Sequence, residues 1–263
     1  MYKIKSPAKI NIFLDVLYKR PDGYHEIRSV MQKIKLHDNL IFDIKKQSKD
    51  DYTNNIFLSS NLSYLPLNEN NLCFKAIKYF KRHFNIKDDI HLHIEKHIPM
   101  AAGLGGGSSN FYYTIDFLNN YYKLKLSKSE LVNISNQYGS DIAFFSEDSA
   151  CLCEGRGEVL TPLGHIDNSV IITFTPNIQV STKEIYEAYD SIENINHDTQ
   201  SKIIIDAIKN NEFYKVYNLC FNSLEDVTIK KYPIIQDIKN DFYKNGAKLS
   251  LMSGSGPTVF YIN

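Results

Sequence analysis

The sequence has no surplus of either charge, because 30 basic and 30 acidic side chains cancel over its 263 residues. It therefore lacks the electrostatic attraction on which binding to nucleic acids and anionic membranes depends. Its apolar runs are too short for a membrane-spanning helix, and its first residues lack the apolar core of a signal peptide. We therefore expect a cytoplasmic protein whose partners are neither nucleic acid nor membrane.

Cysteine is scarce, and the four residues are not spaced as metal ligands. Cys151 and Cys153 lie on one face of a predicted strand, and the other two are far away in the sequence. His91 and His93 also alternate with apolar residues and could ligate a metal. A solvated strand face explains them better, because no carboxylate or cysteine completes a site. We expect reduced, buried thiols and no metal ligand among these residues.

Hydrophobic residues make up 43% of the chain and charged residues 23%, which is typical of a globular protein. Strands are predicted at residues 8–18, 27–34, 38–44, 90–95, 170–175 and 258–262. Helices are predicted at residues 70–84, from 111, from the capping box of Ser127 and Glu130, and at 203–209, 213–224 and 233–243. Because strands and helices mix without strict alternation, we expect an α+β fold, with domains at 1–163 and 164–263.

A glycine-rich segment is the most informative feature. Four glycines within five positions, from Gly103 to Gly107, are followed by Ser108, Ser109 and a helical spacing of apolar residues. Glycine allows positive φ and close approach to a ligand, and the N-terminus of a helix attracts anions. The segment is not a Walker A loop or a dinucleotide fingerprint, since neither spacing is present. It could be a simple turn, but it is more typical of a phosphate site.

Three further clusters carry polar groups. Lys9 and Asn11 share one face of an otherwise apolar strand, where a lone lysine would ordinarily extend toward solvent. Tyr24 and His25 follow a glycine turn. Asp141 stands between a turn and an apolar run, where it could be a helix cap. A second glycine–serine loop, residues 252–257, precedes the last predicted strand.

Together, these segments resemble the superfamily named for galactokinase, homoserine kinase, mevalonate kinase and phosphomevalonate kinase (GHMP). The resemblance rests on residues 7–11, 22–25, 99–109, 139–141 and 252–256, so it covers nearly the whole chain. It implies an N-terminal domain like the second domain of ribosomal protein S5 and a ferredoxin-like C-terminal domain. It also implies an enzyme that uses ATP with Mg2+.

The same resemblance assigns the ATP-binding residues. Asn71 and Lys96 match positions that line the adenine pocket. The phosphates are expected at Pro99, Met100, Ala101, Ala102, Gly103, Leu104, Gly105, Gly106, Gly107, Ser108 and Ser109. Lys9 and Asp141 match the catalytic pair. Bulky Phe111, Tyr112 and Tyr113 stand where members usually have small residues, so the helix behind the loop must pack differently.

The segment Asp22-Gly23-Tyr24-His25 resembles members whose acceptor is a cytidine diphosphate-linked methylerythritol. By that resemblance Tyr24 and Tyr186 hold the cytosine ring between them, and His25 reads its polar edge. Asn11 and Thr182 match further contacts to the acceptor. Two alternatives stay open: another small-molecule kinase of the superfamily, such as a mevalonate or homoserine kinase, and a nucleotide-binding relative without catalysis.

Overall fold

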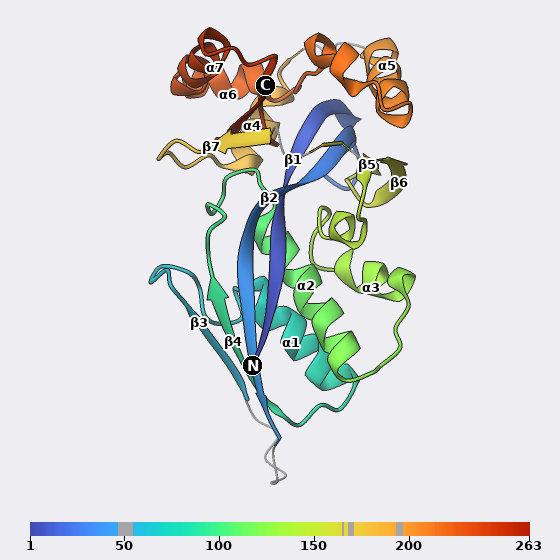
Figure 1. Cartoon of the computed structure of the whole chain (residues 1–263), viewed down its shortest axis with the longest axis vertical. Coiled ribbons are helices and arrows are strands. Elements are labelled where there is room, and N and C mark those ends of the chain that lie inside the picture. Colours follow the sequence, from blue (N-terminus) through green and yellow to red (C-terminus); the bar gives the residue numbers. More distant parts are fainter. Residues whose placement is uncertain (47–54, 165, 168–170, 193–196) are drawn as a thin grey trace. The chain divides into compact units, whose positions relative to one another are not determined.

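The computed structural model describes residues 1–46, 55–164, 166–167, 171–192 and 197–263. Two long strands run through it, β1 (Tyr2–Lys19) and β2 (His25–Lys45), and they pair with each other (Figure 1). The chain forms two compact units. Unit 1 comprises Met1–Ala8, Leu36–Ile98 and Gly106–Ser146, and unit 2 comprises Lys9–Lys35, Pro99–Gly105 and Glu147–Asn263. Both long strands therefore contribute residues to both units.

Unit 1 contains a sheet with helices packed together beside it. Strand β3 (Ile56–Ser60) lies parallel to β4 (Asp89–Glu95), and β4 pairs antiparallel with the second half of β2. The helices are α1 (Leu72–His83), α2 (Gly106–Tyr121), α3 (Lys128–Ser135) and the 3-10 turn η1 (Ala143–Ser146). Helices α1 and α2 lie side by side (Figure 1). Alternate β4 residues, Ile90, Leu92 and Ile94, are buried, as expected for a strand with one apolar face.

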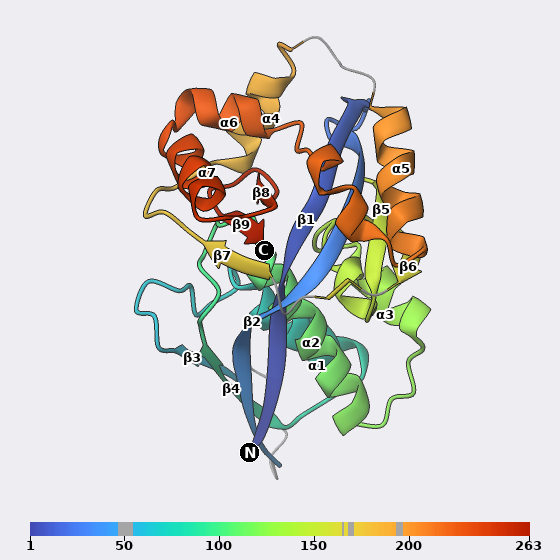
Figure 2. The ribbon, with the colours of Figure 1, turned by 45° about the horizontal axis from the view of Figure 1, so that its top comes forward.

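Unit 2 contains two antiparallel arrangements of strands. The first half of β2 pairs with β5 (Ala150–Gly155), which pairs with β6 (Val159–Gly164). The second sheet has the order β7 (Ile171–Phe174), β9 (Val259–Ile262), β8 (Leu249–Met252). The helices are α4 (Thr182–Tyr189), α5 (Asp198–Lys209), α6 (Glu225–Lys231) and α7 (Ile234–Lys244). Figure 2 shows α6 and α7 beside β8 and β9.

One apolar cluster joins these parts of unit 2. Leu14 of β1, Ile185 of α4 and Val259 of β9 are all buried in it, together with Leu224 and Met252. Burial of a large aliphatic side chain contributes about 1.5–3 kcal/mol, so this cluster fixes α4 against β1. Among the residues that the structure describes, no helix is long and apolar enough to cross a bilayer.

The α+β fold is confirmed, but several element predictions were wrong. Residues 27–34 and 38–44 form the single strand β2, because no glycine or proline interrupts the chain between them. Strand β1 begins at Tyr2, six residues earlier than predicted. Strands β3, β6 and β8 and helices α4 and α6 were not predicted. Of the strand predicted at 170–175, β7 covers 171–174, and residue 170 lies outside the described residues.

The helix predicted at residues 213–224 is also absent. The chain instead makes the short 3-10 turns η3 (Phe213–Lys215) and η4 (Tyr217–Leu219) and then becomes extended. The extended part pairs with β1: Leu14 N–H donates to Phe221 C=O at 3.0 Å, and Ser223 N–H donates to Leu14 C=O at 2.8 Å. Pairing with a distant strand thus overrides a local helical pattern.

The compact units are composed differently from domains at 1–163 and 164–263, since β1 and β2 belong to both units. The boundary after residue 163 stays a prediction.

Candidate active site

Lys9 and Asn11 form a buried polar pair on β1, with exposed fractions of 3% and 2%. Lys9 Nζ donates to Asn11 Oδ1 at 2.7 Å, and Asn11 Nδ2 donates to Ser29 Oγ at 2.8 Å. Ser29 Oγ in turn donates to Phe13 C=O at 2.6 Å. The lysine therefore does not extend to solvent. It is held by an amide whose orientation the serine fixes.

The first part of the glycine loop, Pro99–Gly105, lies against this pair within unit 2. Lys9 N–H donates to Leu104 C=O at 2.9 Å, and Ser253 Oγ donates to Gly103 C=O at 3.0 Å. Asn11 N–H also approaches Ser253 Oγ, at 3.4 Å. Three segments that are distant in the sequence, around residues 9, 103 and 253, are thus brought together.

Glycine is required at position 103. Its φ is +73°, and a Cβ there would lie 2.1 Å from the carbonyl oxygen of Ser253. Neighbouring loop residues also have positive φ, at Ala101 and Gly105. The close approach of loop 252–256 therefore depends on the missing side chain.

In unit 1, helix α2 begins at Gly106, directly after the loop. Gly106 itself does not have positive φ, but a Cβ there would lie 3.0 Å from Ile98 Cγ2 and 3.1 Å from Lys96 Nζ. The N–H groups of the first helical turn have no partner within the helix. This end of α2 thus presents backbone donors next to a lysine, which suits an anion. Ser109 is fully buried, and its Oγ is 2.7 Å from Ser6 Oγ.

Lys96 forms a buried ion pair with Asp38 in unit 1; the side chains are 4% and 0% exposed. The Asp38 carboxylate also accepts from the N–H groups of His97 and Ile98, each at 2.8 Å, and from Asn110 Nδ2 at 3.0 Å. Burying an ion pair is tolerated when its remaining atoms are hydrogen-bonded, as here. Asp38 fixes the Lys96 ammonium, and it was not among the predicted residues.

Asn71 is the N-cap of α1. Its Oδ1 accepts from Cys73 N–H at 2.8 Å, and its Nδ2 donates to Pro66 C=O at 2.8 Å. Asp141 is a partly exposed residue in the turn before η1. In this turn Ile142 N–H donates to Gly139 C=O at 3.4 Å. Both residues belong to unit 1.

The large aromatic residues near the start of α2, directly behind the glycine loop, pack against other aromatic rings of unit 1. Phe111 is fully buried, and its ring centroid is 4.7 Å from that of Tyr138. Tyr112 packs edge-on against Tyr113. The bulky residues behind the glycine loop are thus accommodated by aromatic contacts within unit 1.

Helix α4 carries two of the predicted acceptor residues, Thr182 and Tyr186, four positions apart and so on one face. Thr182 Oγ1 is 2.8 Å from Ser255 Oγ, which places it at loop 252–256. Tyr186 packs against His25, with 4.8 Å between ring centroids and 34° between ring planes. One face of α4 therefore connects this loop to the imidazole of His25.

Tyr24 is 54% exposed, and the Arg156 guanidinium lies 5.0 Å from the centroid of its ring. Its N–H donates to Asp22 Oδ1 at 3.1 Å, which fixes the turn that presents it. An exposed aromatic ring that is backed by a cation suits stacking on a base. That Tyr24 and Tyr186 hold one base between them stays a prediction.

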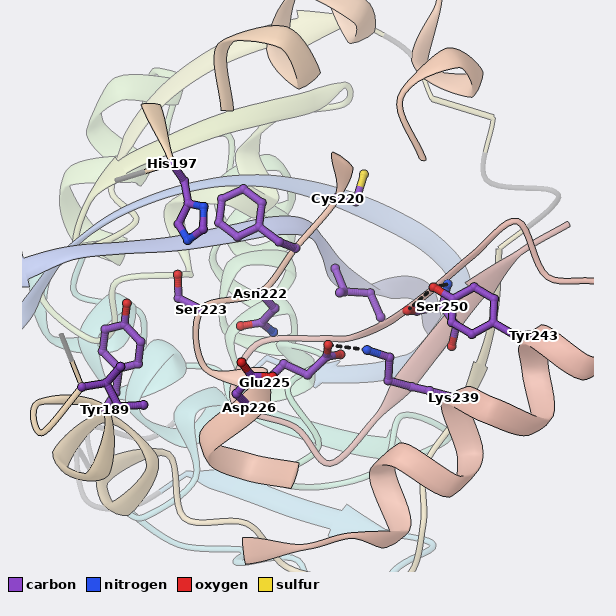
Figure 3. Close-up of a pocket in the computed structure, with 13 residues that line it drawn as sticks. Tyr189, His197, Cys220, Asn222, Ser223, Glu225, Asp226, Lys239, Tyr243 and Ser250 are labelled. Carbon is purple, nitrogen blue, oxygen red and sulfur yellow. Dashed lines mark hydrogen bonds and ion pairs between the residues drawn. The ribbon is translucent and has the colours of Figure 1, made fainter. Parts of the chain in front are cut away.

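A cavity of about 270 Å³ lies elsewhere in unit 2 (Figure 3). Its wall includes the ion pair of Glu225 and Lys239, whose side chains are 10% and 12% exposed. Glu225 Oε1 also accepts from Met252 N–H at 2.7 Å. None of the predicted site residues lines this cavity. Its charged pair holds α6, α7 and β8 together.

Comparison with known proteins identifies the family. A model of the GHMP kinases N-terminal domain matches residues 71–148, and one of the GHMP kinases C-terminal region matches residues 204–262. The 4-diphosphocytidyl-2-C-methyl-D-erythritol kinase of Clostridium perfringens is 41% identical over 98% of this chain and 87% of its own length. The chain belongs to the GHMP kinase family. The kinase of the same name from Geobacillus thermodenitrificans is 40% identical over 98% of this chain and 86% of its own length.

Solved structures agree with this assignment. A crystal structure of 4-(cytidine 5'-diphospho)-2C-methyl-D-erythritol kinase superposes on this GHMP kinase with a TM-score of 0.78 and 25% identity, covering 99% of this chain and 90% of that one. A homoserine kinase from Cytophaga hutchinsonii gives a TM-score of 0.77 at 15% identity, covering 99% of this chain and 84% of that one. The second match shows the shared fold. As a GHMP kinase, the chain is an ATP-dependent small-molecule kinase.

The structure of this GHMP kinase groups the predicted residues within each unit. Unit 2 brings Lys9 and Asn11 together with residues 99–105, and it brings His25 together with Tyr186. Unit 1 holds Asn71, Lys96, Asp141 and the residues from Gly106 to Ser109. The roles assigned to these residues stay predictions. Sequence reasoning gave no role to Asp38, which pairs with Lys96, or to Asp190, which contacts His25.

Proposed function

We propose that this GHMP kinase transfers the γ-phosphoryl group of ATP to the 2-hydroxyl of 4-diphosphocytidyl-2-C-methyl-D-erythritol, a step of non-mevalonate isoprenoid precursor biosynthesis. The observation that carries the proposal is the similarity of 41–42% identity over 98% of the chain to several curated kinases of that name. The contact of His25 with Tyr186 supports it, because the resemblance assigns both residues to the same cytosine site.

The ATP site is proposed at residues 99–109, with Asn71 and Lys96 beside the adenine. The arrangement suits a polyphosphate: α2 begins at Gly106, and a side chain there would fill the space beside Ile98 and Lys96. Mg2+ is the proposed companion ion. It would come with the phosphates, which Mg2+ commonly prefers to an all-protein cage. Within the described residues no three His, Cys, Asp or Glu side chains gather as a metal site.

The chemistry needs positioning and charge neutralisation more than covalent help. Asp141 would accept the proton of the attacking hydroxyl as general base. Lys9, whose ammonium is held by Asn11, would offset negative charge on the phosphoryl group. Backbone N–H groups at the start of α2 would stabilise charge that develops on the phosphate oxygens.

The acceptor would be bound mainly through its base. Tyr24 and Tyr186 would stack on cytosine, which supplies affinity but little selectivity, since every base has a π-face. Selectivity would come from His25, which reads the edge of the ring. Asn11 and Thr182 would contact the rest of the acceptor, and both are tied to loop 252–256 by hydrogen bonds.

An ATP turnover assay tests the proposal. The purified protein is given Mg2+ and ATP with 4-diphosphocytidyl-2-C-methyl-D-erythritol, with the same methylerythritol lacking the cytidine diphosphate, with mevalonate and with homoserine. We expect phosphorylation of the first acceptor alone. Preferred phosphorylation of mevalonate or homoserine would identify a different GHMP kinase. ATP binding without turnover of any acceptor would indicate a relative without catalysis.

A further inference from the structure

Asp190 makes two contacts at the end of α4 that no predicted role accounts for. Its Oδ1 is 2.7 Å from His25 Nε2, and its Oδ2 is 2.5 Å from Lys19 Nζ. Lys19 ends β1 and His25 begins β2, so one carboxylate holds both ends of the turn that carries Tyr24. The His25 side chain is only 8% exposed. All of these residues belong to unit 2.

The carboxylate is ionised. Hydrogen bonds from Lys19 and His25 hold the pKa of Asp190 below its usual value. An ionised carboxylate accepts hydrogen bonds and cannot donate them. Because Asp190 faces Nε2, that nitrogen of His25 must carry the proton.

In a neutral imidazole with its proton on Nε2, Nδ1 is an acceptor. Cytosine presents an amino group, a donor, at position 4, whereas uracil presents a carbonyl oxygen, an acceptor, at the same position. An acceptor on His25 therefore pairs with cytosine and repels uracil. The other tautomer would do the reverse.

We propose that Asp190 is a positioning residue that fixes the tautomer of His25 and thereby makes the acceptor site selective for cytidine over uridine. The inference rests on the proposed function, because it needs His25 to face the base. Asp190 is well placed for it: its backbone N–H donates to Tyr186 C=O at 3.1 Å, so the helix that carries the stacking tyrosine also carries the carboxylate. The His25 ring packs against that tyrosine.

The decisive variant is Asp190→Asn, whose amide can donate to Nε2 and so permits the opposite tautomer. We measure kcat/KM for the cytidine acceptor and for the same acceptor with uridine. We expect the ratio of the two to fall about 10–100-fold, the range known for loss of a carboxylate that orients a metal-bound histidine, while the KM for ATP is unchanged. Asp190→Glu should keep much of the wild-type ratio, since glutamate retains a carboxylate.

Two further variants separate this role from a merely structural one. Lys19→Met removes the second contact of Asp190 but leaves the bond to Nε2, so the ratio should be retained. Glu184→Gln is the matched control: it removes another carboxylate on α4 that pairs with a lysine, Lys231, and it should also leave the ratio unchanged. If Lys19→Met lowers the ratio as far as Asp190→Asn does, the carboxylate only holds the two ends of the turn together, and the proposal is wrong.

A second readout does not depend on activity. The 15N spectrum of the His25 side chain should show a protonated Nε2 and an unprotonated Nδ1 in the wild-type protein at neutral pH. In Asp190→Asn the two nitrogens should exchange character at least in part. A wild-type ring with its proton on Nδ1 would overturn the tautomer assignment. A wild-type protein that phosphorylates neither acceptor, with the expected spectrum, would instead overturn the proposed function.

Discussion

At the scale of single residues, Asp141 is the proposed general base, and Asp141→Asn tests it. Asparagine has the shape of aspartate but cannot take the proton, so turnover should fall by about two to four orders of magnitude while ATP and acceptor binding persist. Asp241→Asn, at an exposed residue of α7, is the control and should keep full activity. Near-normal turnover of Asp141→Asn would leave Asp141 as a structural residue of its turn.

Tyr24 and Tyr186 offer a second test at this scale. Each change to alanine should weaken binding of the cytidine acceptor by about 1–3 kcal/mol, the range for loss of one stacked ring on a base. Affinity for ATP should barely move in either variant. Tyr214→Ala, at another exposed tyrosine of unit 2, should change neither. Calorimetric titration measures both affinities. Weaker ATP binding in Tyr24→Ala would mean that the pocket has been assigned to the wrong substrate.

At the scale of elements, two helix caps separate folding from binding. Asn71 caps α1 and Ser127 caps α3, each through a side-chain oxygen that accepts a backbone N–H. Changing either to alanine should lower the free energy of unfolding by about 1 kcal/mol. Only Asn71→Ala should also weaken ATP binding, because only Asn71 is assigned to the adenine site. Equal ATP affinities in the two variants would mean that Asn71 only caps α1 and does not contribute to ATP binding.

The close approach of loop 252–256 to the glycine loop gives a prediction with an internal control. Gly103 and Gly246 both have positive φ, at +73° and +93°, so alanine at either costs about 1–2 kcal/mol. A Cβ at Gly103 would also collide with Ser253, whereas nothing lies within 4 Å at Gly246. Urea unfolding should show that Gly103→Ala destabilises the protein clearly more than Gly246→Ala. Equal losses would mean that loop 252–256 moves aside at little cost.

Elements could be predicted where local signals were unopposed. The capping box of Ser127 and Glu130 begins α3 as expected, and the spacing after the glycine loop forms α2. The helix predicted at 213–224 failed because Asn222 is engaged elsewhere: its Nδ2 donates to Met252 C=O and Gly254 C=O, each at 2.8 Å. No local pattern encodes those partners, which are about thirty residues away.

The contacts among the candidate site residues could likewise be predicted only where a local sequence pattern marks them. Lys9 and Asn11 share a strand face, so period-2 alternation was enough to pair them. Asp190 lies 165 residues from His25, at the end of a helix that was not predicted, and nothing in its own segment marks it. Contacts of this kind form only when tertiary packing brings distant segments of the chain together.

At the scale of the whole molecule, burial makes stability depend on pH. Burial raises the pKa of the Cys73 thiol to about 12, while an exposed thiol in the unfolded chain ionises near 8.5. As the pH rises, the thiol therefore loses its proton at a lower pH in the unfolded chain than in the folded chain. The free energy of unfolding consequently falls as the pH rises from about 9 toward 12. Urea unfolding at about pH 8 and pH 10 measures the loss, which Cys73→Ala should reduce. An unchanged pH dependence in that variant would assign the effect to other groups.

The sharing of β1 and β2 between the two units has a consequence for synthesis on the ribosome. All residues of unit 1 have been made once Ser146 is joined, whereas unit 2 also needs β9, which follows Ser146 by more than a hundred residues. Unit 1 can therefore form while the chain is still growing, because domains fold as they emerge. Residues 9–35, already translated, must wait for more than a hundred residues before β5, β6 and the second sheet arrive. A pause in translation after unit 1 would leave the polar pair of Lys9 and Asn11 without its loop 252–256, so this kinase acquires that loop only after unit 1 has been made.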